Sequence, residues 1–128
     1  MWLRLSTILV AVVCVSGCGS SSTNPSPAGP PTPTPAPSTA VVTIPVGARS
    51  LGSSAYSPNP LTVSVGTTVT WMNADSIAHT STSTATPSAF DTGSIAGGAS
   101  ASFKFNTAGS FPYHCTFHPG MVSTIVVQ

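Results

Sequence analysis

The sequence has very little charge. Only 5 of its 128 residues are charged, 3 of them Lys or Arg and 2 of them Asp, and glutamate is absent. An average soluble domain carries about 25% charged residues, against 4% in this chain. Binding to nucleic-acid phosphates requires a cluster of Lys and Arg, and so does a polybasic helix on a membrane surface. Both classes are therefore excluded.

A long hydrophobic run is also missing. The apolar segment 5–15 follows a single positive charge, Arg4, and is too short to cross a bilayer as a stable helix. This pattern indicates an export signal. Its end, VSGCG at 15–19, resembles the bacterial lipobox, in which a peptidase cuts before a cysteine that carries lipid. We expect residues 1–17 to be a lipoprotein signal peptide and Cys18 to be lipidated; a plain secretory signal is the alternative.

The segment 19–40, which follows the expected lipobox, has no charged residue and no apolar periodicity. We expect residues 18–40 to comprise the lipidated cysteine and a linker rich in Pro, Ser and Thr, because 19–40 contains 7 of the 13 prolines. Such a composition favours extended polyproline II, and 22 residues at about 3.1 Å each span up to roughly 65 Å. The chain is thus expected at the periplasmic or extracellular face of a bacterial membrane, anchored through Cys18.

Cysteine is scarce. Of the three cysteines, we expect Cys14 to be removed with the signal peptide and Cys18 to be acylated, which would leave Cys115 alone. An unpaired thiol in an exported protein is open to oxidation. Its presence therefore indicates a function.

The remaining residues, 41–128, form one domain with a modest core. β-branched or alternating segments separated by glycine turns predict strands at 41–44, 61–65, 67–73, 101–105, 111–115 and 121–127. No segment predicts a helix of three turns, and 81–98 is the least defined part. The pattern indicates an all-β fold, an antiparallel β-sandwich.

Residues able to bind a metal are concentrated in one loop and one upstream position. Cys115, His118 and Met121 have C-x2-H-x2-M spacing before the last expected strand, and His79 lies upstream. Soft sulfur donors favour Cu(I) and imidazoles accept both oxidation states, so this donor set suits copper. Taken singly, each residue has an ordinary structural explanation, but together they predict one type 1 copper ion. Strand alternation points His114 away from Cys115, which makes it a non-ligand.

The sequence resembles the cupredoxins, in particular the plastocyanin and amicyanin branch. The similar segments are YSP at 56–58, VGTTVTW at 65–71, FDTG at 90–93, AGSFPYHC at 108–115 and the ligand loop CTFHPGM at 115–121. The resemblance implies an eight-stranded Greek-key sandwich. It also implies that His79 and His118 bind copper through ring nitrogens, Cys115 through its thiolate and Met121 through an axial sulfur.

Three positions differ from this branch. Ala78 precedes His79 where this branch often has proline. Thr80 stands where an asparagine commonly ties the first ligand segment to the cysteine loop, and we expect its hydroxyl to make a similar tie. Phe117 replaces a proline and keeps its backbone N–H. We expect that N–H to donate a second hydrogen bond to the Cys115 sulfur.

The resemblance implies single-electron transfer between redox proteins. Such redox chemistry needs no substrate pocket, so we do not expect an enzyme. Without Arg4, two cationic and two anionic side chains remain, so partners are expected to dock on an apolar rim around His118 with little salt dependence. We expect a monomer. Three alternatives remain open: a copper carrier or resistance protein with the same ligands, a hydrolase using Cys115 with His79 or His114, and a metal-free adhesive sandwich.

Overall fold

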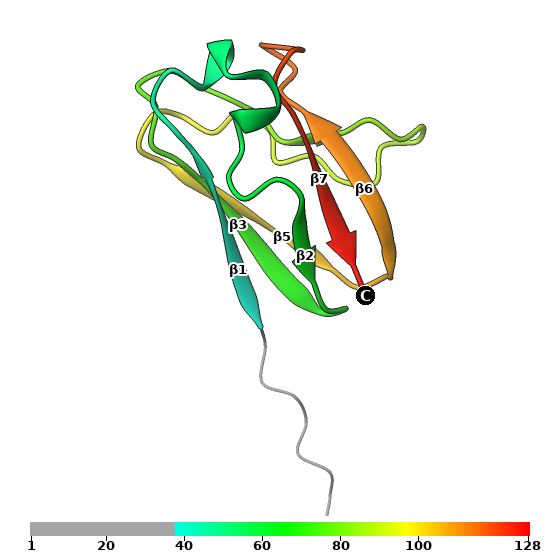
Figure 1. The fold of residues 1–128 in the computed structure, drawn as a ribbon. Coiled ribbons are helices and arrows are strands. Elements are labelled where there is room, and N and C mark those ends of the chain that lie inside the picture. The colour runs from blue at the N-terminus through cyan, green and yellow to red at the C-terminus, as the bar shows by residue number, and fades with distance from the viewer. Residues whose placement is uncertain (1–37) are drawn as a thin grey trace, which may run out of the picture. The chain divides into compact units, whose positions relative to one another are not determined.

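Seven strands form two sheets in the computed structural model, which describes residues 38–128 (Figure 1). The first sheet has the order β1-β3-β5, with β1 at Thr39–Ile44, β3 at Thr67–Asn73 and β5 at Ser100–Phe105. The second has the order β2-β7-β6-β4, with β2 at Leu61–Val63, β7 at Val122–Val127, β6 at Gly109–His114 and β4 at Thr82–Ser83. Two short 3-10 helices, η1 (Ala48–Ser50) and η2 (Gly52–Ser54), connect β1 to β2.

The predicted all-β sandwich is confirmed, but its sheets are mixed. Strands β3 and β5, β4 and β6, and β6 and β7 pair antiparallel, whereas β1 pairs parallel with β3 and β2 pairs parallel with β7. The parallel pairs arise because the chain passes from β1 in one sheet to β2 in the other before it returns to β3. Residues 38–128 contain seven strands, one fewer than the resemblance implies.

Alternation along β3 shows why the two sheets pack together. Thr67, Val69, Trp71 and Asn73 are buried, and the residues between them are more exposed. A strand presents alternate side chains to opposite faces, so one face of β3 lies in the core. Trp71 is fully buried there and stacks on Phe90, with ring centroids 5.4 Å apart.

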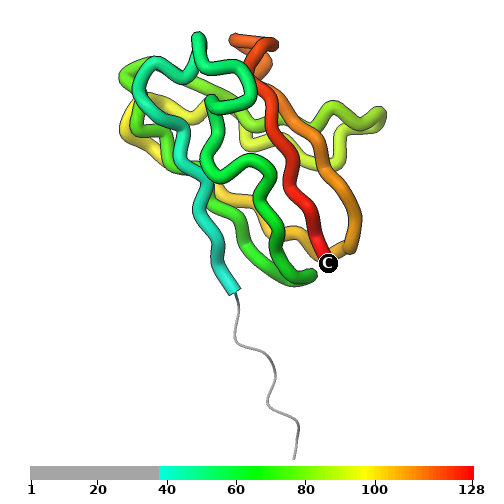
Figure 2. The backbone as a smooth tube through the Cα atoms, in the orientation of Figure 1, coloured from blue at the N-terminus to red at the C-terminus, as the bar shows by residue number. Residues whose placement is uncertain are grey.

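The loop between β6 and β7 lies at the end of the sandwich opposite the C-terminus (Figure 1). Helices η1 and η2 lie at the same end, and a Cβ placed on Gly52 would be 3.9 Å from the Gly120 carbonyl oxygen. Residues 84–89 are exposed and belong to the yellow-green segment that projects from the body of the fold (Figure 2). The 81–98 region contains only the short strand β4 and isolated bridges such as His79 with Ile95.

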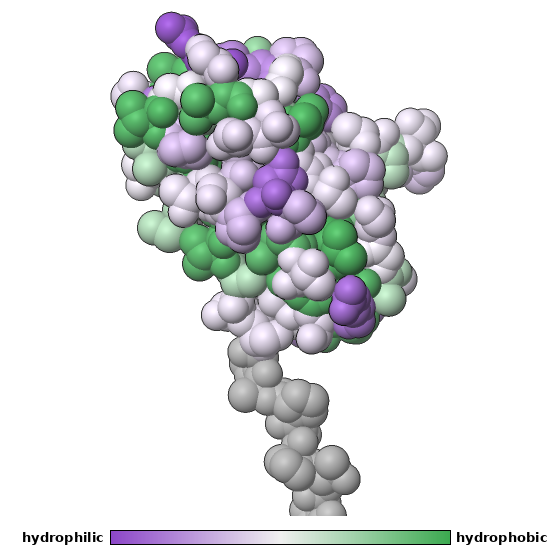
Figure 3. All heavy atoms as spheres, in the orientation of Figure 1, coloured by the Kyte–Doolittle hydropathy of each residue, from purple (hydrophilic) through white to green (hydrophobic). Residues whose placement is uncertain are grey.

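The surface of residues 38–128 has few charges and several exposed apolar side chains. Figure 3 shows mostly pale and green residues on this face, with few strongly hydrophilic ones. The large exposed hydrophobic residues are Val41, Val46, Leu51, Val65, Met72, Phe117 and Val122. In this part of the chain, no helix is long and apolar enough to cross a membrane. The expected signal peptide, Cys18 and most of the linker lie outside the described residues.

Candidate metal centre

Three of the four predicted ligands converge at the end of the sandwich. One side-chain donor atom from each of His79, Cys115 and His118 lies within 4.8 Å of the others. The Cys115 Sγ is 3.8 Å from His79 Nδ1 and 3.6 Å from His118 Nδ1. His79 and Cys115 are fully buried, and His118 is partly exposed. The donor group is therefore buried on the side of His79 and Cys115 and reaches the surface at His118.

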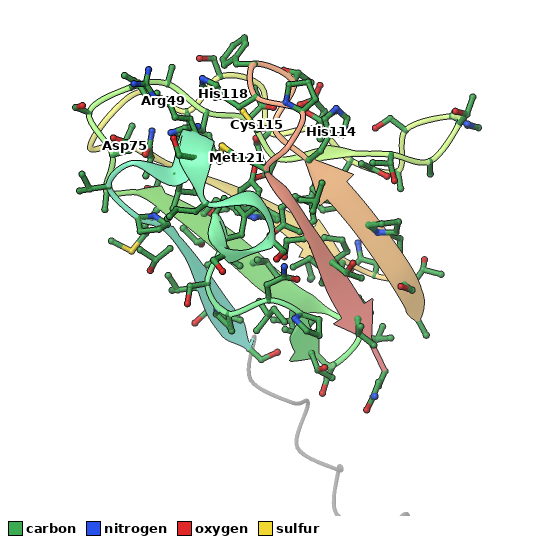
Figure 4. All side chains as sticks on the ribbon, turned by 45° about the horizontal axis from the view of Figure 1, so that its top comes forward. Arg49, Asp75, His114, Cys115, His118 and Met121 are labelled. Carbon is green, nitrogen blue, oxygen red and sulfur yellow. The ribbon has the colours of Figure 1, made fainter. Side chains whose placement is uncertain are left out.

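The backbone of the 115–121 loop is a compact double turn that brings the fourth residue close. The N–H of His118 donates to the Cys115 carbonyl at 3.2 Å, and the N–H of Met121 donates to the His118 carbonyl at 2.9 Å. The Cys115 N–H donates to the Met121 carbonyl at 3.1 Å. Met121 is fully buried, and in Figure 4 it lies just below Cys115 and His118.

Thr80 connects the His79 segment to this loop, as its sequence position predicted. Its hydroxyl oxygen accepts a hydrogen bond from the backbone N–H of Thr116 at 2.8 Å. Its own backbone N–H donates to Cys115 Sγ at 3.3 Å. The predicted hydrogen bond from the Phe117 N–H to this sulfur is wrong for the structure described, where Thr80 is the backbone donor to Sγ. In the same turn, the N–H of His118 donates to the Cys115 carbonyl and not to the sulfur.

Asp75, which the sequence analysis left without a role, contacts the ligand group directly. Its Oδ2 lies 3.1 Å from His79 Nε2, and Oδ1 accepts a hydrogen bond from the Ser76 N–H at 2.8 Å. The hydrogen bond with His79 is the main reason that the pKa of Asp75 is lowered, and the backbone N–H groups of Ser76 and Gly47 add to it. The signal available in the sequence was an acidic residue four positions before a candidate ligand.

Buried aromatic residues lie beneath the donor group. Trp71 Nε1 donates to the hydroxyl of Tyr113 at 3.2 Å, and the Tyr56 hydroxyl donates to the Thr80 carbonyl. The rings of Tyr56 and Tyr113 meet edge to face, with centroids 4.8 Å apart. Burial raises the pKa of both tyrosines. These contacts fix the end of β6 that precedes Cys115.

His114 lies apart from the converging donors. It ends β6 and continues the alternation of that strand, with Tyr113 before it and Cys115 after it buried and His114 intermediate. Figure 4 shows its side chain on the β6 side of the loop. The group of converging donors in the described residues does not include it.

The donor geometry fits a single small metal ion. Bonds of roughly 2.3 Å to sulfur and 2.0 Å to nitrogen, set 120° apart, place the two donor atoms about 3.7 Å from each other. The observed sulfur–nitrogen distances of 3.8 and 3.6 Å agree with this value. Two imidazoles and a thiol with a buried methionine nearby are the donor types of a type 1 copper site.

Comparisons with known proteins agree with the geometry. Residues 42–128 match the family model described as copper binding proteins, plastocyanin/azurin family. Among solved structures, a purple cupredoxin from Nitrosopumilus maritimus is 33% identical with a TM-score of 0.64, over 70% of this chain and 99% of that one. A reduced amicyanin variant with a proline-to-phenylalanine substitution is 32% identical with a TM-score of 0.60, over 70% of this chain and 82% of that one.

No match was found among curated proteins. The family match covers nearly the whole described domain, and it includes the 115–121 loop and His79. The protein therefore belongs to the plastocyanin/azurin family of copper-binding proteins, and copper is its cofactor.

Proposed function

We propose that this protein is a blue copper protein that carries single electrons between redox partners. The observation that carries the proposal is the convergence of one buried thiol and two imidazole nitrogens. The sulfur lies 3.6 and 3.8 Å from these nitrogens. When bound, copper supplies a one-electron couple between its cuprous and cupric states. We assign His79 and His118 as ligands through Nδ1, Cys115 through Sγ and Met121 as the axial thioether.

The surrounding residues support electron transfer because they hold the donors still. Cys115 follows directly after β6 and its sulfur accepts the Thr80 N–H, while the 115–121 loop is held by its own turn hydrogen bonds. His79 is fully buried, and its backbone bridges to Ile95 at 3.1 and 2.7 Å. Donors fixed in this way rearrange little between oxidation states, and the burial excludes water from the sulfur.

We propose that partners dock on an apolar rim around His118. Phe117 is 54% exposed beside it, and Leu51 and Val122 are exposed large hydrophobic residues next to η2 and the ligand loop. Of the four charged side chains in residues 38–128, Asp75 is buried, which leaves the surface with Arg49, Lys104 and Asp91. A small apolar contact gives a short-lived complex whose association rate depends little on salt.

The proposed location is the exported face of a bacterial membrane, with the domain tethered through lipid on Cys18. This proposal is supported by the segment 1–19 of the sequence alone. Metabolic labelling with a radioactive fatty acid tests it. The wild-type chain should incorporate label and the Cys18→Ala variant should not; equal labelling of both contradicts the anchor.

Electron exchange needs no substrate pocket, so we propose a carrier and not an enzyme. A copper carrier with the same ligands differs from it in one measurable way. A redox carrier retains its copper through repeated reduction and reoxidation, whereas a carrier that delivers copper releases it in the reduced state to a competing chelator. Copper content after repeated cycles of ascorbate and ferricyanide decides between them.

The spectrum of the full chain after addition of Cu(II) tests the site itself. A His2Cys site with a weak axial methionine should give intense absorption near ~600 nm and a small parallel hyperfine splitting in the EPR spectrum. Cys115→Ser should lose the absorption, while Cys14→Ser, a change in the expected signal peptide, should leave it intact. A colourless wild-type protein overturns the proposal.

A further inference from the structure

Asp75 is a buried carboxylate without a basic side chain to balance it. Only 6% of its surface is exposed. Among residues 38–128, its nearest basic group is the His79 ring, which carries a charge only when protonated, and neither Arg49 nor Lys104 pairs with it. Buried charges normally have a compensating partner, because transfer of an isolated carboxylate from water is very unfavourable. Hydrogen bonds from His79 and the Ser76 N–H stabilise this carboxylate, and a cation in the metal centre would balance its charge.

The turn that carries Asp75 is rigidly built. The Asp75 N–H donates to Asn73 Oδ1 at 3.0 Å, and Asn73 Nδ2 donates to the carbonyls of Ile77 at 2.8 Å and Ile95 at 2.9 Å. Gly97 packs against the same turn so closely that a Cβ there would lie 2.8 Å from the Asp75 carbonyl oxygen. The carboxylate therefore has a fixed position relative to His79.

This position determines which ring nitrogen of His79 carries the proton. An ionised carboxylate only accepts hydrogen bonds, so the Nε2 that lies 3.1 Å from Asp75 Oδ2 must be the donor. In a neutral imidazole the other nitrogen then has the free lone pair. That nitrogen is Nδ1, which faces the Cys115 sulfur at 3.8 Å. Asp75 thus selects the tautomer that can bind a metal on the side of Cys115.

Asp75 also adds a second negative charge to the site. The carboxylate and the Cys115 thiolate lie on opposite edges of the His79 ring. Together these two buried anions balance a divalent cation, whereas a monovalent cation leaves one negative charge uncompensated. A charge close to a buried site acts more strongly than the same charge at the surface, where water screens it.

We propose that Asp75 is a positioning residue that fixes the metal-binding tautomer of His79 and favours Cu(II) over Cu(I) through its charge. This inference rests on the proposed blue copper site and adds a role that the ligand residues alone do not supply. A carboxylate hydrogen-bonded to a ligating histidine is a general means of orienting the ring and strengthening it as a donor.

The chain offers a matched control for the test. Asp91 is exposed and its Oδ1 accepts hydrogen bonds from the Thr82 hydroxyl and the Gly93 N–H, and no contact joins it to a ligand. Asp75→Asn and Asp91→Asn in the full chain remove the same charge. The ratio of Cu(II) to Cu(I) affinity, read from the midpoint potential, should shift toward Cu(I) at least tenfold for Asp75→Asn, equivalent to about 59 mV for one electron. Asp91→Asn should change it less than threefold.

Two further measurements keep the inference testable if Asp75→Asn folds poorly. Asp75→Glu restores the charge and should return the potential toward that of the wild type. In the diamagnetic Cu(I) form of the wild type, nitrogen-15 NMR should detect a slowly exchanging proton on Nε2 of His79. A proton on Nδ1 overturns the tautomer assignment.

The outcomes separate this inference from the proposed function. A wild-type protein without the blue spectrum overturns both. A blue wild type in which Asp75→Asn and Asp91→Asn shift the affinity ratio equally overturns only the role of Asp75, because the shift then reflects net charge alone.

Discussion

The hydroxyl oxygen of Thr80 accepts the backbone N–H of Thr116 at 2.8 Å, and this bond joins the segment of His79 to the loop of Cys115. The hydroxyl oxygens of Thr80 and Thr116 also lie 3.2 Å apart, and the Thr82 hydroxyl oxygen lies 3.1 Å from that of Thr80. Residues 36 positions apart in the sequence are thus held together by a threonine side chain next to the sulfur.

Thr80→Ala should destabilise the metal-free protein. The substitution leaves the partly buried N–H of Thr116 without its acceptor, and such a loss costs about 1–2 kcal/mol. Urea unfolding should show a lower midpoint with an unchanged slope. Thr80→Ser keeps the hydroxyl and should retain most of the stability. Equal stability of the Ala and Ser variants would show that the tie contributes nothing.

The strand pattern was predictable because alternation and glycine turns are local signals. The expected strand 67–73 coincides with β3, since Gly66 ends the preceding turn with a φ of +87° and buried residues alternate after it. The ligand loop was likewise predictable from the spacing of Cys115, His118 and Met121, because all three lie within one short turn. Each of these features depends on neighbours in the sequence.

Features that depend on distant neighbours were not predictable in this way. Alternation shows which face of a strand is buried, but not which strand lies beside it, so the parallel pairing of β1 with β3 could not be inferred. The direction of the Phe117 N–H depends on the loop conformation. The contact of Asp75 with His79 depends on the turn that Asn73 and Gly97 hold in place.

Substitution of Met121 should change the redox balance in a direction set by the new side chain. Met121 is fully buried, and we assign its sulfur as the weak axial donor. Met121→Gln offers a harder oxygen donor that favours Cu(II) and should lower the midpoint potential, while Met121→Leu offers no donor and should raise it. We expect shifts of about 59 mV, a tenfold change in affinity ratio. Voltammetry measures both, and shifts of the same sign would contradict the axial assignment.

Phe117→Glu should slow electron exchange between two copies of the protein. If molecules meet at the apolar rim, the substitution places like charges against each other at contact, and salt should partly restore the rate by screening them. NMR line broadening in mixtures of the Cu(I) and Cu(II) forms measures the exchange rate. We expect a decrease of roughly tenfold at low salt.

Val65→Glu is the matched control for Phe117→Glu. Val65 is 48% exposed, and its N–H donates to the carbonyl of Gln128 near the C-terminus, at the end of the sandwich away from the ligand loop (Figure 1). The Val65→Glu variant carries the same added charge as Phe117→Glu but should leave the electron exchange rate nearly unchanged. Similar slowing in both variants would mean that net charge, and not the rim around His118, controls the encounter.

The two tyrosines should resist ionisation until the protein unfolds. Tyr56 and Tyr113 are the only tyrosines in the sequence and both are buried, which raises the pKa of each above the ordinary value of 10. Above pH 10 the unfolded chain therefore loses protons that the folded chain keeps, so the free energy of unfolding falls as pH rises. The expected slope is up to about 1.4 kcal/mol per pH unit for each tyrosine.

Ultraviolet titration of the metal-free protein measures this effect. Tyrosinate absorbance should be absent from the folded protein near pH 10 and appear together with the loss of tertiary structure at higher pH, whereas in urea it should appear near pH 10. Tyr56→Phe should halve the final absorbance change and reduce the slope of stability against pH, because one buried hydroxyl remains at Tyr113. Tyrosinate absorbance in the folded wild type near pH 10 would contradict the raised pKa values and would mean that the hydroxyls beneath the metal centre are accessible to water.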